Sequence, residues 1–314
     1  MCRNRIRLAS IVASMLLLSQ GLGLATGMAT RAGAATAPRG DLAKAGIVFA
    51  RLQGTPENHE IWTMGRRGGN QHRLTHNDIG DFDPVWSPDG SRIAWVRYPQ
   101  AACNCGPGDV WVMGADGTDP YNLTNDAADI SRPTWSPDGT QIAFTRGYEI
   151  WMIGADGSDE HRISPVGSFD FDPAWSPDGT RIAFVSAEDV SFDLYSMRPD
   201  GTDRQQLTHT IGISEHRPAW SPDGSRIAFS GLHSTSGWHV DLMRADGSGV
   251  HILVDAYSLD PAWSRSGSHL AFYACVSDCD LYTIRRNGTN LEPLGRHRGL
   301  SDIQPDYRDV IPEM

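Results

Sequence analysis

The sequence predicts an all-β chain folded as a six-bladed β-propeller of four-stranded antiparallel blades, closed by a C-terminal strand that completes the first blade. Three observations lead to this prediction. The string Trp-Ser-Pro-Asp-Gly recurs along the chain, a β-rich triplet follows each copy at a fixed distance, and Asp-Gly or Asn-Gly pairs recur after the third strand. Four short strands in a period of about 44 residues are typical of a propeller blade.

Each repeat supplies its own strands and turns. Five tryptophans begin the string, the last in the variant form Trp-Ser-Arg-Ser-Gly: Trp86, Trp135, Trp175, Trp220 and Trp263. A second-strand triplet such as Ile182-Ala183-Phe184 begins seven residues after each tryptophan. The third strand ends at a pair such as Asp200-Gly201, which tolerates the positive φ of a tight hairpin turn. A fourth short strand follows, so each copy holds one complete blade.

The sixth blade is divided between the two ends of the chain. Residues 47–49, 61–64 and 72–74 read as second, third and fourth strands, but no Trp-Ser-Pro-Asp-Gly string precedes them. At the other end, residues 304–307 occupy the place of residues 172–175, with no further strands after them. We therefore expect the C-terminal strand to pair with the N-terminal three. The propeller should cover residues 46–308, followed by a tail at 309–314.

These repeats resemble the TolB-type β-propeller family, whose PD40 repeat is WD40-like. The likeness rests on the run from Asp172 to Gly179 with the triplet that follows it, and it extends over residues 46 to about 308. It implies a periplasmic propeller, here without the N-terminal α/β domain of TolB itself. The Gly-His and Trp-Asp signatures of WD40 blades are absent from the sequence.

The first residues predict export. Arg3, Arg5 and Arg7 precede an apolar run from Leu8 to Ala25, and small residues follow it. This order is that of a secretory signal peptide, with a retained membrane anchor as the alternative. We expect a cleaved signal at residues 1–34, a leader at 35–45, a periplasmic or extracellular protein, and no stable membrane insertion after cleavage.

The charge of the chain limits its partners. The formal net charge is −11, and the predicted signal holds four arginines and no acidic residue, so its removal makes the chain more acidic. Nucleic acid requires a basic face, so we expect no nucleic-acid binding. An acidic chain attracts cationic partners or metal ions.

Strand direction sorts the connections into two faces. The first-to-second and third-to-fourth connections keep a nearly constant length on one side, here called the turn face. The fourth-to-first and second-to-third connections vary in length on the other side, here called the loop face. A fixed scaffold with variable loops usually acts through the loops, so we expect the loop face to carry function.

Two sets of residues precede the first-strand proline of the blades. The pre-proline set comes immediately before it and alternates in sign until its last member: Asp83, Arg132, Asp172, Arg217, Asp260 and Gln304. The upstream set lies two positions earlier: Asp81, Ile130, Asp170, Glu215, Ser258 and Asp302. Both are expected where the chain enters the central channel.

The two sets have a functional and a structural interpretation. As a charged channel mouth they would receive a protein segment or a small polar ligand, with aromatic surface from Tyr98 and Trp238. As interblade ion pairs they would only hold the ring together. Oxygen-rich rims also suit Ca²⁺, although no single loop has a calcium-site spacing; no other cofactor is expected.

The cysteines form two local pairs in second-to-third-strand loops. Cys275 and Cys279 are expected to form a disulfide, because an exported chain with paired loop cysteines usually does so. Cys103 and Cys105 enclose one residue; a disulfide between them would be strained, with metal binding or free thiols as alternatives.

Catalytic motifs are absent from the sequence. There is no Gly-x-Ser-x-Gly elbow and no His-Glu-x-x-His pair. We therefore expect a non-catalytic, monomeric recognition scaffold. The alternative is a channel-centred hydrolase or lyase that acts on saccharides or esters through carboxylates of different blades.

Overall fold

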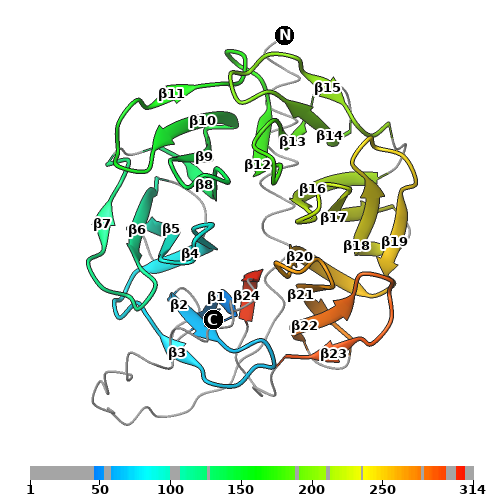
Figure 1. The fold of residues 1–314 in the computed structure, drawn as a ribbon, viewed down its shortest axis with the longest axis horizontal. Helices are drawn as coiled ribbons and strands as arrows, with labels where there is room; N and C mark the ends of the chain where they lie inside the picture. The colour runs from blue at the N-terminus through cyan, green and yellow to red at the C-terminus, as the bar shows by residue number, and fades with distance from the viewer. Residues whose placement is uncertain are drawn as a thin grey trace. The chain divides into compact units, whose positions relative to one another are not determined.

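The computed structural model describes residues 46–52, 58–99, 107–125, 128–187, 191–209, 213–234, 236–276, 279–294 and 302–307. These residues form six sheets of four antiparallel strands arranged in a ring (Figure 1), which confirms the predicted fold class. Among them, no helix is long and apolar enough to cross a membrane. The predicted signal peptide and leader, Cys103, Cys105 and the C-terminal tail lie outside the described residues.

The blades follow one another along the chain. Blade one contains β24 (Asp302–Tyr307), β1 (Ile47–Leu52), β2 (His59–Met64) and β3 (His72–Arg73); blade two contains β4 (Gly80–Trp86), β5 (Arg92–Tyr98), β6 (Asp109–Gly114) and β7 (Tyr121–Asn122). Blade three contains β8 (Ile130–Trp135), β9 (Gln141–Arg146), β10 (Glu149–Gly154) and β11 (His161–Arg162); blade four contains β12 (Asp170–Trp175), β13 (Ile182–Ser186), β14 (Asp193–Met197) and β15 (Gln205–Gln206). Blade five contains β16 (Ile213–Trp220), β17 (Arg226–His233), β18 (Gly237–Arg244) and β19 (His251–Val254); blade six contains β20 (Tyr257–Trp263), β21 (His269–Cys275), β22 (Cys279–Arg285) and β23 (Glu292–Pro293).

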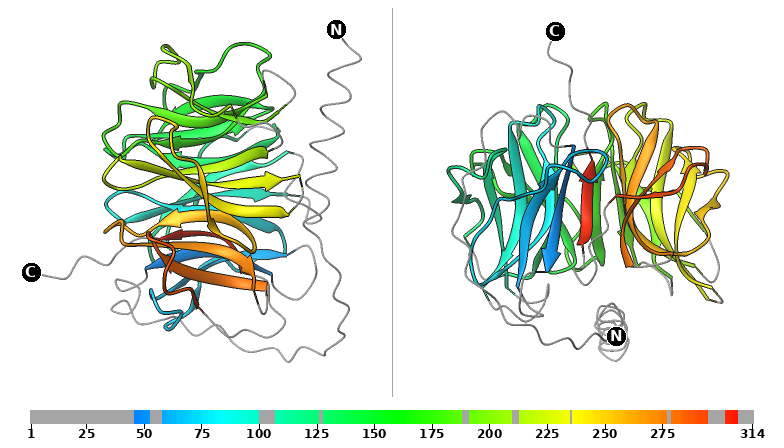
Figure 2. Two further views of the ribbon diagram at one scale, coloured as in Figure 1. Left: turned by 90° about the vertical axis from the view of Figure 1, so that its right-hand side faces the viewer. Right: turned by 90° about the horizontal axis from the view of Figure 1, so that it is seen from below.

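The ring closes in blade one, as the divided repeat predicts. β24 pairs antiparallel with β1, and the two strands lie side by side in Figures 1 and 2. The Arg51 guanidinium donates two hydrogen bonds to the Asp302 carboxylate, at 2.5 and 2.6 Å, and both side chains are buried. The guanidinium also lies over the rings of Phe49 and Trp62. The first and last strands of the propeller are thus joined by a ladder and a buried ion pair.

The core lies within and between the sheets. The second-strand aromatics are fully buried in all six blades: Phe49, Trp95, Phe144, Phe184, Phe229 and Phe272. The repeat tryptophan fills the space between blades; Trp135 of blade three packs in one cluster with Ala94 and Val112 of blade two. Burying large aromatic side chains contributes about 1.5–3 kcal/mol each, so the core consists of several hydrophobic clusters that join neighbouring blades.

Turn residues are placed where the backbone requires them. Gly201 has a φ of +81°, and a Cβ there would lie 2.2 Å from the Ile163 carbonyl oxygen. The third-to-fourth turn of blade four therefore docks closely on blade three, which only glycine permits. In the Ser-Pro-Asp-Gly turns the aspartate accepts hydrogen bonds from neighbouring hydroxyl and N–H groups, as Asp178 does from Ser176 and Thr180.

Candidate functional site: the central channel

Each innermost strand carries a β-bulge where the pre-proline residue meets its proline. The register between the first and second strands shifts by one residue across this pair in all six blades. A bulge leaves a residue unpaired, and proline has no N–H to pair. The φ angles of the pre-proline set are all positive: Asp83 50°, Arg132 56°, Asp172 54°, Arg217 55°, Asp260 58° and Gln304 53°. Such backbone is costly for residues other than glycine and is concentrated at functional sites.

Side chains of the pre-proline set are joined by hydrogen bonds to the backbone of the next blade. Gln304 Oε1 accepts the N–H of Asp83 at 2.9 Å. Asp83 Oδ2 accepts the N–H of Arg132 at 3.2 Å, and Asp172 Oδ2 accepts the N–H of Arg217 at 3.0 Å. An acceptor side chain at this position therefore satisfies an N–H that the bulge leaves without a ladder partner.

An arginine side chain has no hydrogen-bond acceptor. In the two blades whose pre-proline residue is arginine, blades three and five, a second-strand hydroxyl accepts the N–H of the next blade instead. Thr145 Oγ1 accepts the N–H of Asp172, and Ser230 Oγ accepts the N–H of Asp260, both at 3.1 Å. Sequence reasoning missed these two residues. The signal was present, because blades three and five are the ones with a serine or threonine directly after the second-strand aromatic.

Ion pairs connect the pre-proline set across the channel. Arg132 Nε lies 3.3 Å from Asp83 Oδ1 and 3.8 Å from Asp172 Oδ1. Arg132 Nη2 lies 3.2 Å from Asp260 Oδ1, which belongs to blade six on the opposite side of the ring. Arg217 also donates a hydrogen bond to Asp260. One guanidinium thus links carboxylates of three blades, and both interpretations of the pre-proline set, pairing and channel lining, apply to the same residues.

Burial and charge act in opposite directions on these groups. Burial raises the pKa of Asp83 above its ordinary value; Arg132 and Arg217 oppose this shift, and Asp260 adds to it. Burial disfavours the charge of Arg132, but Asp83, Asp260 and Asp172 outweigh it, so the pKa of Arg132 is raised. The arginine therefore stays charged, and Asp83 is the carboxyl at which an added cation would relieve an unfavourable environment.

A cavity of about 290 Å³ occupies the channel. Its lining consists of the pre-proline set, the prolines that follow and the next one or two residues of the innermost strands, together with Pro222 of a first-to-second turn. Since these strands run from the loop face to the turn face, the cavity extends from the charged ring toward the turn face. The sequence placed the site on the loop face; it did not reveal that proline and small residues leave open space beyond the ring.

The four acids of the upstream set do not line this cavity. Asp81, Asp170, Glu215 and Asp302 are at most 2% exposed. Asp81 pairs with Arg97, Asp170 with Arg204, Asp302 with Arg51, and Glu215 accepts the N–H of Leu194. In a regular strand, residues two apart share a face, but the bulge breaks that alternation. The upstream acids consequently pair within the protein while the pre-proline set faces the channel.

The two predicted aromatic residues also lie away from the cavity lining. Tyr98 is 1% exposed, and its hydroxyl donates to the Ile130 carbonyl at 2.6 Å. Trp238 is half-buried and packs edge-on against His216, with ring centroids 5.2 Å apart. Tyr98 is thus packed inside the protein, and a contact of the half-buried Trp238 with a partner stays a prediction.

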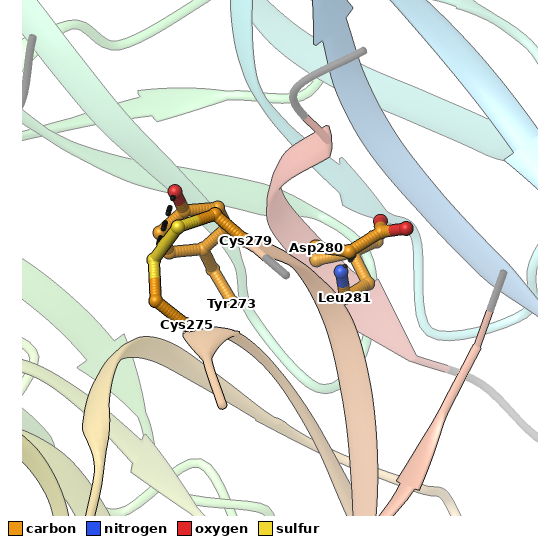
Figure 3. The surroundings of a disulfide bond; sticks show 5 residues. All are labelled: Tyr273, Cys275, Cys279, Asp280 and Leu281. Carbon is orange, nitrogen blue, oxygen red and sulfur yellow. Dashed lines mark hydrogen bonds between the residues drawn. A yellow bond between two sulfur atoms is a disulfide. The ribbon is translucent and has the colours of Figure 1, made fainter. Parts of the chain in front are cut away.

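The predicted disulfide Cys275–Cys279 is present (Figure 3). It connects the end of β21 to the start of β22, and Tyr273 Oη lies 3.6 Å from Cys275 Sγ. In the described part of the chain, no three His, Cys, Asp or Glu side chains are grouped so that they could hold a metal ion. The calcium expectation stays a prediction.

Comparisons with known proteins agree on the fold. The family model described as PD40, TolB beta propeller domain, matches residues 100–264. TolB from Acinetobacter baumannii has a TM-score of 0.71 at 20% identity, covering 83% of this chain and 66% of that chain. Putative TolB from Agrobacterium tumefaciens has a TM-score of 0.63 at 22% identity, covering 80% of this chain and 89% of that one.

An enzyme shares the architecture as well. An oligogalacturonate lyase from Vibrio parahaemolyticus has a TM-score of 0.52 at 13% identity, covering 80% of this chain and 73% of that one. At such identities the likeness concerns the fold alone. The comparison with curated proteins found no match.

Proposed function

The chain belongs to the TolB β-propeller family, and on this premise we propose that it is a non-catalytic recognition scaffold. It binds a protein segment or a small polar ligand in the central channel. It acts as an exported monomer in the periplasm or outside the cell. The observation that carries the proposal is the cavity of about 290 Å³, to which all six blades contribute a pre-proline side chain.

The composition of the cavity supports binding. Ligand sites usually combine mostly apolar walls with a few placed polar groups. Here prolines and tryptophans form the walls, and the charged ring forms one end. The ring side chains remain partly accessible, at 20% for Arg132, 25% for Arg217 and 11% for Asp172. These three side chains are therefore within reach of a ligand in the cavity.

Arg217→Ala tests the proposal. Mature protein is used to capture partners from the exported fraction, and affinity for the recovered ligand is measured by calorimetry. Since Arg217 is a quarter exposed and makes one ion pair among the described residues, the variant should melt near wild type and bind at least tenfold more weakly. Asp178→Asn, on a first-to-second turn, is the control and should bind as wild type does. Unchanged affinity of Arg217→Ala would remove the ring from the binding site.

A channel-centred hydrolase or lyase is the second candidate. The observation in its favour is the raised pKa of Asp83, which burial and Asp260 produce, because a general acid benefits from such a shift. The test is incubation of the protein with oligogalacturonate and with model esters, followed by product analysis. Turnover that disappears in Asp83→Asn would establish the enzyme; its absence at high protein concentration would leave the scaffold.

A further inference from the structure

The closing strand β24 departs from the repeat at two positions that line the cavity. Gln304 stands where the other blades carry aspartate or arginine. Asp306 stands where the other blades carry uncharged, mostly small residues: Val85, Thr134, Ala174, Ala219 and Ala262. Its carboxylate accepts the N–H of Trp86 at 2.7 Å. Blade one therefore contributes an acid to the cavity and omits the guanidinium that would continue the alternation of charge.

The result is an acid-rich sector around blade one. Gln304 stands between Asp260 of blade six and Asp83 of blade two, and Asp306 lies two residues further along the same strand. The cavity lining holds four carboxylates, those of Asp83, Asp172, Asp260 and Asp306, against the guanidiniums of Arg132 and Arg217. Although Arg132 and Arg217 reach Asp83 and Asp260, the lining holds two more carboxylates than guanidiniums, and an added cation would reduce this excess.

Asp83 supplies an independent sign of an incomplete site. The residue is 7% exposed, and its Oδ1 is buried and accepts no hydrogen bond from any described residue. The guanidinium nitrogen of Arg132 at 3.3 Å forms an ion pair with it, without hydrogen-bond geometry. A buried carboxylate oxygen normally has a donor. Because Oδ1 itself is inaccessible to solvent, an added cation would act on the Asp83 carboxylate through its charge and not through a hydrogen bond to this oxygen.

The walls specify the rest of the ligand. Between the charged ring and the turn face, the cavity is lined by the six prolines after the pre-proline set, by Trp175, Trp220 and Trp263 and by small residues, with Thr134 and Asp306 as the polar side chains. Such walls suit an uncharged methylene chain. Lysine and arginine side chains combine a stem of this kind with a cationic end.

Building on the proposed function, we propose that the cavity takes a cationic head on an apolar stem, the chemistry of a lysine or arginine side chain. The head lies beside Asp306, next to the ring carboxylates of Asp83 and Asp260, and the stem lies along the prolines and tryptophans of the walls. The ligand of the scaffold is therefore a basic peptide segment or a small alkylammonium or alkylguanidinium compound.

Three blocked tripeptides test this inference with mature protein: acetyl-Gly-X-Gly-amide with X as lysine, norleucine or glutamate. Norleucine keeps the stem of lysine and removes its charge. Binding is followed by tryptophan fluorescence, because three tryptophans line the cavity. The lysine peptide should bind at least tenfold more tightly than the other two, which corresponds to about 1.4 kcal/mol.

Two variants locate the head group. Asp306→Ala installs the residue that blades four to six carry at this position, so the side chain fits. It also removes the acceptor of the Trp86 N–H, so the melting temperature is measured beside affinity, and the folded variant should lose at least tenfold in affinity for the lysine peptide. Glu292→Ala, on the exposed outer strand β23, removes the same charge elsewhere and should bind as wild type does.

The second variant adds the missing guanidinium. Gln304→Arg fits the backbone, since Arg132 and Arg217 have φ angles of 56° and 55° beside 53° for Gln304. Ala50→Ser accompanies it, because a hydroxyl at this position replaces the acceptor in the arginine blades. The double variant should fold and no longer bind the lysine peptide.

The outcomes separate the two proposals. If the norleucine or glutamate peptide binds as well as the lysine peptide, or if no tripeptide binds, the cationic head is wrong. The recognition scaffold itself is then judged by whether Arg217→Ala weakens binding of the captured partner. Retained lysine-peptide binding in Gln304→Arg with Ala50→Ser would likewise overturn the assignment.

Discussion

Thr145→Val removes one acceptor from the ring with almost no change of shape. Thr145 is 4% exposed, and its hydroxyl accepts the Asp172 N–H at 3.1 Å. Val96 and Val185 occupy the same position in blades two and four and are fully buried, so valine is tolerated there sterically. In blade three the neighbouring side chain is Arg132, which cannot accept a hydrogen bond. The N–H of Asp172 would then lose its partner.

An unsatisfied buried donor costs about 1–3 kcal/mol. In a domain of this size each kcal/mol lowers the melting temperature by roughly 2–4 °C. The measurement is urea unfolding together with thermal melting. The urea midpoint should fall with an unchanged denaturant slope, because the surface exposed on unfolding stays the same.

Thr63→Val is the matched control. Thr63 is fully buried, and its Oγ1 has no hydrogen-bond partner among the described residues. The same chemical change there removes an unsatisfied hydroxyl, so stability should stay level or rise. If both variants have equal stability, or if Thr145→Val melts as wild type does, the hydroxyl is not a replacement for the acceptor that arginine lacks.

Three further predictions follow from buried or hydrogen-bonded charges. Asp302→Asn leaves the charge of Arg51 without a carboxylate partner at the closing ladder, so the free energy of unfolding in urea should fall by about 3–5 kcal/mol. A fall below about 1 kcal/mol would mean that the pair does not hold the ring closed. Burial, with Arg217 and Arg132, lowers the pKa of His216 from 6.5 to about 3. As pH drops below 6.5 the unfolded chain takes up a proton that the folded protein does not, so the free energy of unfolding should fall. His216→Phe should make the plot of unfolding free energy against pH flatter in this range. Hydrogen bonds from neighbouring serines lower the pKa of Asp223 from 3.8 to about 2. Its contribution to folding stability is complete above pH 3.8 and should be lost as pH falls through 2. Over this interval the melting temperature of Asp223→Asn should decline less steeply than that of wild type.

The architecture could be predicted because its determinants are local and repeated. The tryptophan string, the triplet seven residues later and the Asp-Gly turns each specify a strand end or a strand within a few residues. Five complete copies and one divided copy of a four-stranded unit are typical of a closed propeller ring. The divided blade left one strand, Asp302–Tyr307, and one open edge beside Ile47–Leu52, so even this long-range pairing could be read from the sequence.

The candidate site could be predicted in part. The position and alternating sign of the pre-proline set indicate its place in the channel. The upstream acids were expected in the same channel because both sets come where the chain enters it, and in a regular strand residues two apart would share a face. Only the tertiary structure shows the bulge at Asp83 and Pro84, which directs Asp83 into the cavity and leaves Asp81 paired with Arg97.

The same limit applies to the hydroxyls and to the cavity. Thr145 serves the backbone of the next blade, and Asp306 faces an open space that residues of all six blades enclose. Strand formation depends on neighbours along the chain, and therefore the amino-acid sequence by itself determined the blades and their closure. Hydrogen-bond satisfaction and empty volume depend on neighbours in space, and for that reason the tertiary structure decided which charged residues belong to the channel.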